Sequence, residues 1–522
     1  MGLVLGIDVS TTATKAILIE PDGAVRGIGS ADLRVSMPQP GWSEQDPADW
    51  WSAAGSAISQ ALAAASASGA DVEAVGLTGQ MHGAVLLDAG GAVLRPAILW
   101  NDQRTVAECD EIRSLIGRER LIAITGNDAI PGLTAPKLLW VRRHEPEIWS
   151  RLTHVLLPKD YLRYCLTGGF AIDKADGSGT LLFDLAARNW SPDLLSELGL
   201  EADWFPPTFE GPEVTGSVTR DAAEATGLRT GTPVVAGGGD QSANAVGVGV
   251  VAEGSVALSL GTSGVIFAAT ESPVHEPNGR VHAFCHAVPG RWHLMSVMLS
   301  AAGSLRWFRD ALAPGEDFGE LAGSAADVEA GTDGLFFLPY LSGERSPHPD
   351  PLARGAFIGL ALRHDRRHLV RAVLEGVAFG LRDGLDLVVG AGVPRPGQIR
   401  ASGGGLASPV WAQILADILD AELVATSTTE GAAYGAAILA AVGVRWFDDV
   451  PAAAASLVHV SPVARPLSTG SRYADAHAAY GELYPALAPV FHAQQATTRG
   501  TQRSPDGHAA GSSGGASPGL RR

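Results

Sequence analysis

Two strand–loop–strand segments constrain the fold of this chain more than any other feature. In the first, an apolar run (3–8) leads into the small, hydroxyl-rich residues 10–14, and a second apolar run (15–20) follows. In the second, VALSLGTSGVIFAAT at 256–270 again places small hydroxyl residues between apolar runs. The recurrence predicts two similar halves whose loops hold a polyphosphate from both sides of a cleft. Two unrelated hairpins are the alternative interpretation.

Helix-start signals alternate with the predicted strands. Asp46 and Ser408 are each followed by proline, which combines an N-cap side chain with the residue preferred at the first helical position. Further helices are expected over Thr134–Arg143 and Pro158–Leu166. Strands alternating with helices predict an α/β protein with mixed sheets.

The chain is long enough for two domains. It has 522 residues, and single cores stop growing at about 250–300 residues. An apolar strand at 233–236 precedes GGGD (237–240), and we place the boundary just after it. Residues 1–246 are expected to form the N-terminal domain and 247–492 the C-terminal domain. Residues 493–522, which have almost no large apolar groups, are expected to be a disordered tail.

Composition and charge exclude several classes of protein. The net charge is −18 and there is no basic footprint, which argues against a nucleic-acid partner. Asp8 interrupts the apolar start that a signal peptide needs, so no signal peptide is expected. Glu253 interrupts the Gly/Ala-rich run near 242–270, so no transmembrane span is expected there. The cysteines form no CxxC pair, which indicates isolated thiols in a reducing cytoplasm. They are Cys109, Cys165 and Cys285.

The two small-residue loops offer a nucleotide cradle of an uncommon kind. The sequence has no GxxxxGK[ST] motif and no strand-linked GxGxxG motif. In segment 8–15, small residues let backbone N–H groups approach phosphate oxygens, and hydroxyl groups add donors. Asp8 at the strand end is suited to hold Mg²⁺ through water. Gly261–Gly264 forms a second such loop. Each loop alone also fits an ordinary polar turn, with Lys15 solvated.

Glycine-rich and polar segments supply candidate chemistry. Three glycines before Asp240 leave its carboxylate exposed in a cleft, where it can accept a proton from a hydroxyl group. SGGGLASP (402–409) at a helix start suits a phosphate or a flat base. The polar residues of QMHG (80–83) and WNDQR (100–104) suit recognition of hydroxyl groups. Ordinary turns, and a structural role for His82, are the alternatives.

In this order along the chain, the segments resemble the FGGY carbohydrate kinases. DxxTxxxK (8–15), GGGD (237–240), GTSG (261–264) and SGGG (402–405) carry the resemblance, and residues 355–376 are similar to the family's C-terminal signature. Further blocks resemble the members that act on D-xylulose. They are GQMHG (79–83), RPAILWNDQR (95–104), TAPKLLWVRRHEPEIW (134–149), LLPKDYLR (156–163), WHLMSVMLSAAGSLRW (292–307) and FLPYLSGERSPH (337–348). The resemblance covers about residues 3–445.

The resemblance implies two actin-like ATPase (ribonuclease H-like) domains around a deep catalytic cleft, with sugar and the first phosphate loop in the N-terminal domain and nucleotide in the C-terminal one. It implies Asp240 as the catalytic base, and Asp8 with Asp240 as the carboxylates that support Mg²⁺. The implied substrate contacts are Met81, His82, Arg104, Asp240 and Gln241. The implied ATP contacts are Thr11, Thr12, Lys15, Gly261, Thr262, Ser263, Gly404 and Ser408.

The implied activity is phosphorylation of D-xylulose to D-xylulose 5-phosphate with MgATP, in the cytoplasm, without nucleic-acid or membrane partners, by a homodimer. The alternatives are a kinase for another ketose or polyol, such as ribulose or arabinitol, a sugar-independent ATPase of the actin/Hsp70 kind, and a sugar-responsive regulator. Three positions depart from the family: Ser10 and Ala13 replace usual glycines, and Ser408 replaces an Asn of some members. A Cβ at position 10 is expected to crowd the phosphates or the backbone and to alter nucleotide affinity.

Overall fold

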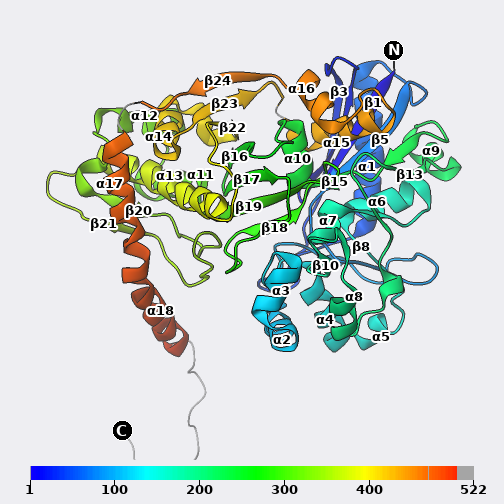
Figure 1. Cartoon of the computed structure of the whole chain (residues 1–522), viewed down its shortest axis with the longest axis horizontal. Coiled ribbons are helices and arrows are strands. Elements are labelled where there is room, and N and C mark those ends of the chain that lie inside the picture. Colours follow the sequence, from blue (N-terminus) through cyan, green and yellow to red (C-terminus); the bar gives the residue numbers. More distant parts are fainter. Residues whose placement is uncertain (1, 429, 468–469, 502–522) are drawn as a thin grey trace, which may run out of the picture.

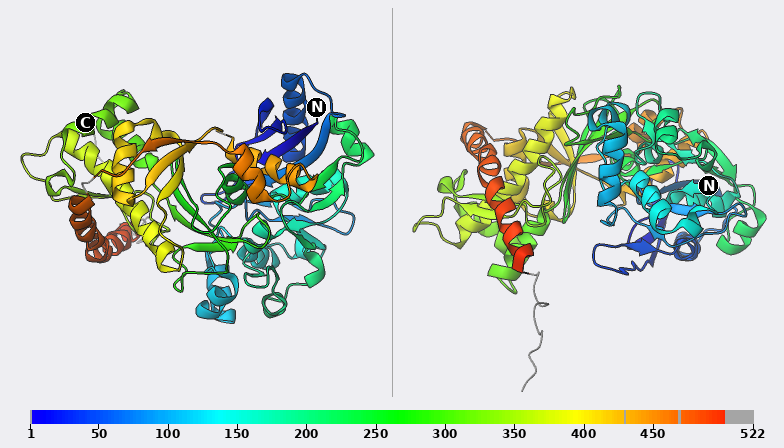
Figure 2. Two further views of the ribbon diagram at one scale, coloured as in Figure 1. Left: turned by 45° about the horizontal axis from the view of Figure 1, so that its top comes forward. Right: turned by 90° about the horizontal axis from the view of Figure 1, so that it is seen from below.

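The computed structural model describes residues 2–428, 430–467 and 470–501. Two bodies lie side by side (Figures 1 and 2), each built on a seven-stranded mixed sheet. The strands of the first sheet are β1 Leu3–Val9, β2 Ala13–Ile19, β3 Val25–Asp32, β5 Val72–Gly79, β13 Val214–Ser217, β14 Pro233–Val235 and β15 Gly238–Gly239. Their order is β13-β14-β5-β1-β2-β3, with β15 also paired to β5.

The strands of the second sheet are β16 Val256–Leu260, β17 Gly264–Thr270, β18 His282–Cys285, β19 Trp292–Met298, β22 Gln398–Ser402, β23 Glu422–Thr426 and β24 Val460–Ala464. Their order is β18-β19-β17-β16-β22-β23-β24. In both sheets a central strand pairs antiparallel with its successor and parallel with a later strand: β1 with β2 and β5, β16 with β17 and β22. The two strand–loop–strand segments therefore occupy equivalent places, which confirms the predicted repeat.

The helices cover these sheets and connect their strands. They are α1 Pro47–Ala65, α2 Val106–Ile116, α3 Arg118–Thr125, α4 Thr134–His144, α5 Pro146–Trp149, α6 Pro158–Thr167, α7 Lys174–Ser178, α8 Pro192–Glu197, α9 Arg220–Thr226, α10 Asp240–Gly247, α11 Ala302–Leu312, α12 Phe318–Gly323, α13 Arg366–Gly390, α14 Pro409–Leu419, α15 Gly431–Gly443, α16 Val450–Leu457, α17 Gly470–Gly481 and α18 Leu483–Thr501. Among the described residues, no helix is both long and apolar enough to cross a membrane.

Short strand pairs outside the two sheets complete the fold. They are β4 Glu44–Gln45 with β7 Ala97–Ile98, β6 Val85–Leu87 with β8 His154–Leu156, β9 Ile172–Asp173 with β12 Thr208–Phe209, β10 Phe183–Asp184 with β11 Asn189–Trp190, and β20 Phe336–Leu338 with β21 Ala356–Ile358. Several of them lie in the first body with α2, α3, α4 and α8, whose buried apolar residues form a separate core cluster.

A helix from late in the sequence covers one face of the first sheet. Alternate residues of β1 and β5 face α1, and the intervening residues face α15. A Cβ at Gly76 would lie 1.9 Å from the Ala436 carbonyl oxygen, so glycine allows α15 to rest on the sheet backbone. Figure 1 shows α15 and α16 beside β1 and β5 of the first sheet, although the strand that precedes them, β23, belongs to the second sheet.

Helices α10 and α15 cross between the two bodies. Ala245 of α10, with Val248 and Val250 just after it, packs against β16 and β17 of the second sheet, while α15 packs against the first. A Cβ at Gly435 would lie 1.8 Å from Ala243 O, and a Cβ at Gly247 would lie 1.9 Å from Gly431 O. The two helices therefore touch backbone to backbone, and this crossing joins the bodies.

The helix starts predicted from local signals are confirmed. The Asp46 side chain accepts a hydrogen bond from Ala48 N at the start of α1, and Ser408 accepts one from Trp411 N at the start of α14. The helices expected near 134–143 and 158–166 are α4 and α6. At the other end of the chain, α18 extends to Thr501 and so covers residues 493–501, where we expected disorder. The rest of that expected tail lies outside the described residues.

Candidate active site

Asp8 and Asp240 lie at the same end of the first sheet. Asp8 is the penultimate residue of β1 and pairs in register with Thr78 of β5. Gly238 of β15 pairs with that same Thr78 from the other side, and Asp240 begins α10 immediately afterwards. Gly237 has a φ of +82°, and a Cβ there would lie 1.9 Å from Leu77 O, so the turn before Asp240 requires glycine.

The two carboxyl groups share a desolvated environment. Burial raises the pKa of Asp8 to about 7; the charge of Asp240 adds to the rise, and Lys15 opposes it. Burial likewise raises the pKa of Asp240 to about 6, although the backbone N–H of Gln241 donates to its Oδ1 at 2.7 Å and favours the charged form. Groups poised in this range suit proton transfer near neutral pH.

These carboxyl groups fit a magnesium ion bound together with phosphate. Asp8 Oδ1 is buried and has no hydrogen-bond partner within the part of the chain that the structure describes. In the described part of the chain no group of three or more acidic, histidine or cysteine side chains could hold a metal ion. Mg²⁺ needs no such cage, because it usually takes one or two carboxylates, water and substrate phosphates. Asp8, supported by Asp240, is therefore a suitable protein ligand.

The first small-residue loop is ordered by its own side chains. The Ser10 hydroxyl donates to Ala13 O at 2.7 Å, and Ser10 is not among the residues with positive φ. The backbone at position 10 therefore does not require glycine, and the expected effect of Ser10 on nucleotide affinity stays a prediction. Thr11 Oγ1 accepts a hydrogen bond from Trp100 Nε1 at 2.9 Å. Thr12 is exposed, and Lys15 Nζ pairs with Glu430 Oε2 at 2.8 Å.

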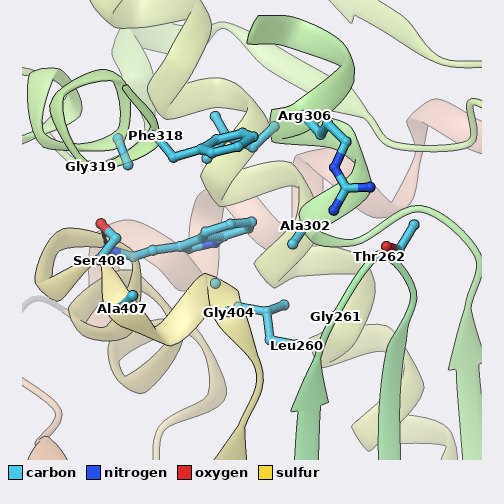
Figure 3. A pocket seen from close by; sticks show the side chains of 14 residues that line it. Leu260, Gly261, Thr262, Ala302, Arg306, Phe318, Gly319, Gly404, Ala407 and Ser408 are labelled. Atoms are coloured by element: carbon cyan, nitrogen blue, oxygen red, sulfur yellow. Dashed lines mark hydrogen bonds between the residues drawn. The ribbon is translucent and has the colours of Figure 1, made fainter. Parts of the chain in front are cut away.

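A cavity of about 270 Å³ lies beside the second loop. Gly261, Thr262, Gly404 and Ser408, four of the expected ATP-contact residues, line it. Figure 3 shows loop 260–262 along one edge and Ser408 at the opposite end. The expected contact Ser263 is exposed and does not line the cavity; its hydroxyl donates to Leu299 O at 3.4 Å.

Aromatic side chains make this cavity suitable for a flat base, and sequence reasoning missed them. Trp411, which is 1% exposed, lies under Gly405, where a Cβ would come within 3.2 Å of its ring. Phe318 lies across the cavity from Gly404 (Figure 3). The guanidinium of Arg309 stacks over the Phe318 ring, 3.9 Å from the ring centroid. Phe318 follows a helix-capping Asp in a segment without any glycine-rich motif, so no local signal indicated that it lines a nucleotide cavity.

His82 is held in a strained conformation at the other side of Asp240. Its φ is +67°, which is uncommon for a residue other than glycine. The backbone oxygen of His82 accepts hydrogen bonds from Lys137 Nζ (2.7 Å) and Thr134 Oγ1 (3.1 Å), which hold this geometry. Such strain is typical of functional sites. The neighbouring Met81 is buried against Phe284.

The chemistry of the His82 ring follows from its surroundings. Burial lowers the pKa of His82 well below its usual range, and the charge of Lys137 lowers it further, so the ring is neutral at pH 7. Nδ1 lies 2.7 Å from Gly179 O, a carbonyl that only accepts, so Nδ1 carries the proton. Nε2 is then an acceptor, suited to a hydroxyl group.

Two expected sugar contacts have other surroundings. The Arg104 side chain is 1% exposed and pairs with Asp102 at 2.7 Å and Glu44 at 2.8 Å. Its guanidinium also stacks 3.6 Å over the ring of Trp42. The structure therefore gives Arg104 a supporting role among protein groups, and direct sugar contact stays a prediction. Gln241 is partly exposed on the first turn of α10, next to Asp240.

A buried ion cluster supports this side of the site and also escaped sequence reasoning. Lys159 Nζ lies 2.5 Å from Asp160, 2.7 Å from Asp173 and 3.3 Å from Asp176, and all four side chains are at most 1% exposed. Asp176 lies next to Gly239: a Cβ added at Gly239 would come within 2.8 Å of Asp176 Oδ1. The cluster fixes α7, whose following residue Gly179 orients His82.

Known proteins match this chain over most of its length. The model of the FGGY family of carbohydrate kinases matches residues 3–247 with its N-terminal domain and 256–444 with its C-terminal domain. Xylulose kinase of Escherichia coli (strain K12) is 48% identical over 441 residues, which cover 84% of this chain and 90% of that protein. Xylulose kinase of Bacillus subtilis (strain 168) is 38% identical over 450 residues, covering 86% and 90%. The crystal structure of xylulose kinase from Rhodospirillum rubrum superposes with a TM-score of 0.87 at 34% identity, covering 94% of this chain and all of that one.

The fold and the site define a sugar kinase with the two-domain, actin-like ATPase fold. The chain belongs to the FGGY family of carbohydrate kinases. This confirms the family, the fold class and the enzyme class predicted from the sequence.

Proposed function

We propose that the protein transfers the γ-phosphoryl group of MgATP to the 5-hydroxyl of D-xylulose. The single observation that carries the proposal is the position of the raised-pKa carboxyls Asp8 and Asp240. They stand at one sheet end, with the Met81–His82 pair on the neighbouring strand end and the base-sized cavity in the other body. The substrate is proposed from the relatives, which are xylulose kinases at up to 48% identity.

The sugar binds on the His82 side of Asp240. Nε2 of His82 accepts a hydrogen bond from a sugar hydroxyl, since the other ring nitrogen is used by Gly179 O. Met81 packs against the carbon chain of the sugar. We expect Gln241 to contact a further hydroxyl, since it follows Asp240 on the first turn of α10. A site that pairs each hydroxyl rejects analogues that lack one.

Phosphoryl transfer then follows from the placement of the carboxyls. Asp240 accepts the proton of the 5-hydroxyl while the sugar oxygen forms its bond to the γ-phosphorus and the bond to the β-phosphate oxygen breaks, releasing ADP. Asp8, with Asp240 nearby, would hold Mg²⁺, which supplies charge neutralisation of the phosphates when bound. The backbone N–H groups and hydroxyls at Thr11, Thr12 and Gly261–Ser263 contact the phosphates. Lys15, on β2 after the first loop, pairs with Glu430, and we expect it to turn toward the phosphates when nucleotide binds.

The adenosine part of ATP occupies the cavity of the second body. Gly404 and Gly405 leave room for a planar ring between loop 403–408 and α12. The Ser408 hydroxyl caps α14, so its contribution is to the shape of this loop. Dimer formation stays a prediction that a measurement of molar mass in solution tests.

ADP release from purified protein with MgATP tests the proposal. We expect strong stimulation by D-xylulose and little by D-ribulose, L-ribulose or glycerol. Stimulation by another sugar or by an arabinitol would keep the kinase class and change the substrate. Hydrolysis that is equally fast without sugar would support a sugar-independent ATPase and contradict the proposal.

A further inference from the structure

Arg345 lies in the FLPYLSGERSPH segment, to which the proposed reaction assigns no role. Its two neighbours in the chain are hydrogen-bonded to strand β19 and to the residue that follows it. Glu344 Oε1 accepts hydrogen bonds from the N–H groups of Leu299 (2.9 Å) and Arg345 (2.7 Å). The N–H of Ser346 donates to Val297 O at 3.0 Å. Arg345 is therefore presented by an anchored loop of the second body.

This loop faces the sugar side of the first body. The end of β19 packs in one cluster with Met81 and Phe284, which joins the two bodies. The rings of His82 and His282 lie 5.9 Å and 5.6 Å from the ring of Phe284. Burial is the main cause of the lowered pKa of both histidines, and the positive charge of Arg345 also contributes to each. Val297, whose carbonyl oxygen holds Ser346, packs against the same cluster, so the Arg345 loop lies beside the groups that surround His82.

The charge of Arg345 is not matched by a protein group. Within residues 2–428, 430–467 and 470–501, its half-buried guanidinium has neither a hydrogen bond nor an ion pair. The adjacent Glu344 directs its Oε1 to backbone N–H groups, and burial raises its pKa to about 8 although the charge of Arg345 opposes that rise, so it compensates the arginine only in part. A partly buried, unpaired cation is costly, which makes such a group a candidate for binding a ligand.

Met81 connects Asp240 with the Arg345 loop. A Cβ at Gly239, the residue before Asp240, would lie 2.8 Å from Met81 Cγ. Met81 packs in turn with Phe284 and Val297, and the Val297 carbonyl anchors the Arg345 loop. A sugar whose reacting hydroxyl lies at Asp240 and whose carbon chain lies along Met81 therefore extends toward Arg345.

We propose that Arg345 is a substrate-contact residue that donates hydrogen bonds to the oxygen atoms at C1 and C2 of the ketose. This inference rests on the proposed function and adds a specificity residue to it. A guanidinium has five N–H donors and no acceptor, and a carbonyl oxygen only accepts. Arg345 thus complements His82 Nε2, which accepts from a hydroxyl. Because Arg345 and His82 belong to different bodies, the bound sugar contacts both.

Steady-state kinetics of Arg345→Met and Arg345→Lys test this inference, with Arg363→Met as control. Arg363 is a 60% exposed arginine of the same body, outside the site. In Arg345→Met we expect the KM for D-xylulose to rise about tenfold or more, as for loss of a charged hydrogen bond. The KM for ATP and the kcat should stay within about twofold, because the contact is made in the ground state as well. The KM of Arg345→Lys for D-xylulose should lie between those of the wild type and Arg345→Met, since lysine keeps the charge but lacks the planar guanidinium.

Other results would overturn the inference. An unchanged sugar KM in Arg345→Met would remove Arg345 from the sugar site, and a fall in kcat alone would place it at the transferred phosphoryl group. Thermal melting and ADP binding show whether each variant is folded; if Arg345→Met is not, a wild-type KM in Arg345→Lys would refute the contact. If the unmodified protein phosphorylates another sugar of the panel, the proposed substrate fails, and the same KM ratio measured with that sugar decides the role of Arg345.

Discussion

Replacing Gly435 by alanine should separate α10 from α15 and damage both stability and catalysis. The added Cβ would lie 1.8 Å from Ala243 O, 2.7 Å from Ala243 C and 2.9 Å from Gly247 N. All three are backbone atoms of α10, so no side-chain rotation relieves the contact. The helices must move apart by about 1 Å or more. Overpacking of this kind costs about 1–3 kcal/mol, against about 1 kcal/mol gained by alanine in a helix.

The displacement also reaches the chemistry, because α10 begins at Asp240. A misplacement of about 1 Å at a reacting group can lower the rate by about 10²-fold. Gly390→Ala is the matched control: it changes a glycine at the end of α13 where a Cβ would meet nothing within 4 Å. We expect Gly435→Ala to melt at a lower temperature and to have a lower kcat, and Gly390→Ala to keep both or gain stability. Wild-type melting and kcat in Gly435→Ala would refute the backbone contact between the helices.

Three further predictions concern the two carboxyls and the cavity. Asp240→Asn should lower kcat by about 10²–10⁴-fold with ADP binding retained, measured by coupled kinetics and calorimetry; near wild-type turnover would remove Asp240 from the role of base. In the absence of Mg²⁺, the same variant should gain stability over the wild type as pH rises from about 4 to about 6. The folded pKa of Asp240 is raised to about 6, so the unfolded chain loses that proton first and wild-type stability falls by about 1.4 kcal/mol per pH unit in this range. Denaturant unfolding at pH 4.5 and 7 checks this, and a stability difference independent of pH would contradict it. Phe318→Ala should raise the KM for ATP about tenfold, as for loss of a stacked base, while leaving the KM for sugar unchanged; equal changes in both would exclude a role confined to the base.

Local signals in the sequence predicted the parts of the fold that depend on local chemistry. Asp46 and Ser408 predict the helices that follow them because a capping side chain accepts a hydrogen bond from an N–H group only two or three residues away. The strand–loop–strand repeat was visible because both copies need the same small residues. Asp8 and Asp240 were identified through motifs that lie next to strand ends, and the structure brings the two carboxyls together.

Features that depend on contacts between distant segments were not predictable in this way. Nothing in residues 431–443 says that this helix returns to the first sheet, since its small residues suit any close packing. The roles proposed for Phe318 and Arg345 depend on the groups that the fold sets opposite them. Arg104 was expected to contact the sugar, and only the structure shows that Glu44 and Asp102 pair with its guanidinium. The domain boundary near 246 stays a prediction.

The glycine crossing of α10 and α15 has a mechanical consequence. Two helices in backbone contact can rotate over one another but cannot approach further, so the crossing acts as a pivot between the bodies. Rotation about a pivot moves each atom in proportion to its distance from the axis. Asp240, on the first turn of α10, would then travel little, whereas the base cavity beside α12 and α14 would travel far. If the two bodies rotate about this crossing, a large displacement of the adenosine cavity would accompany only a small displacement of Asp240.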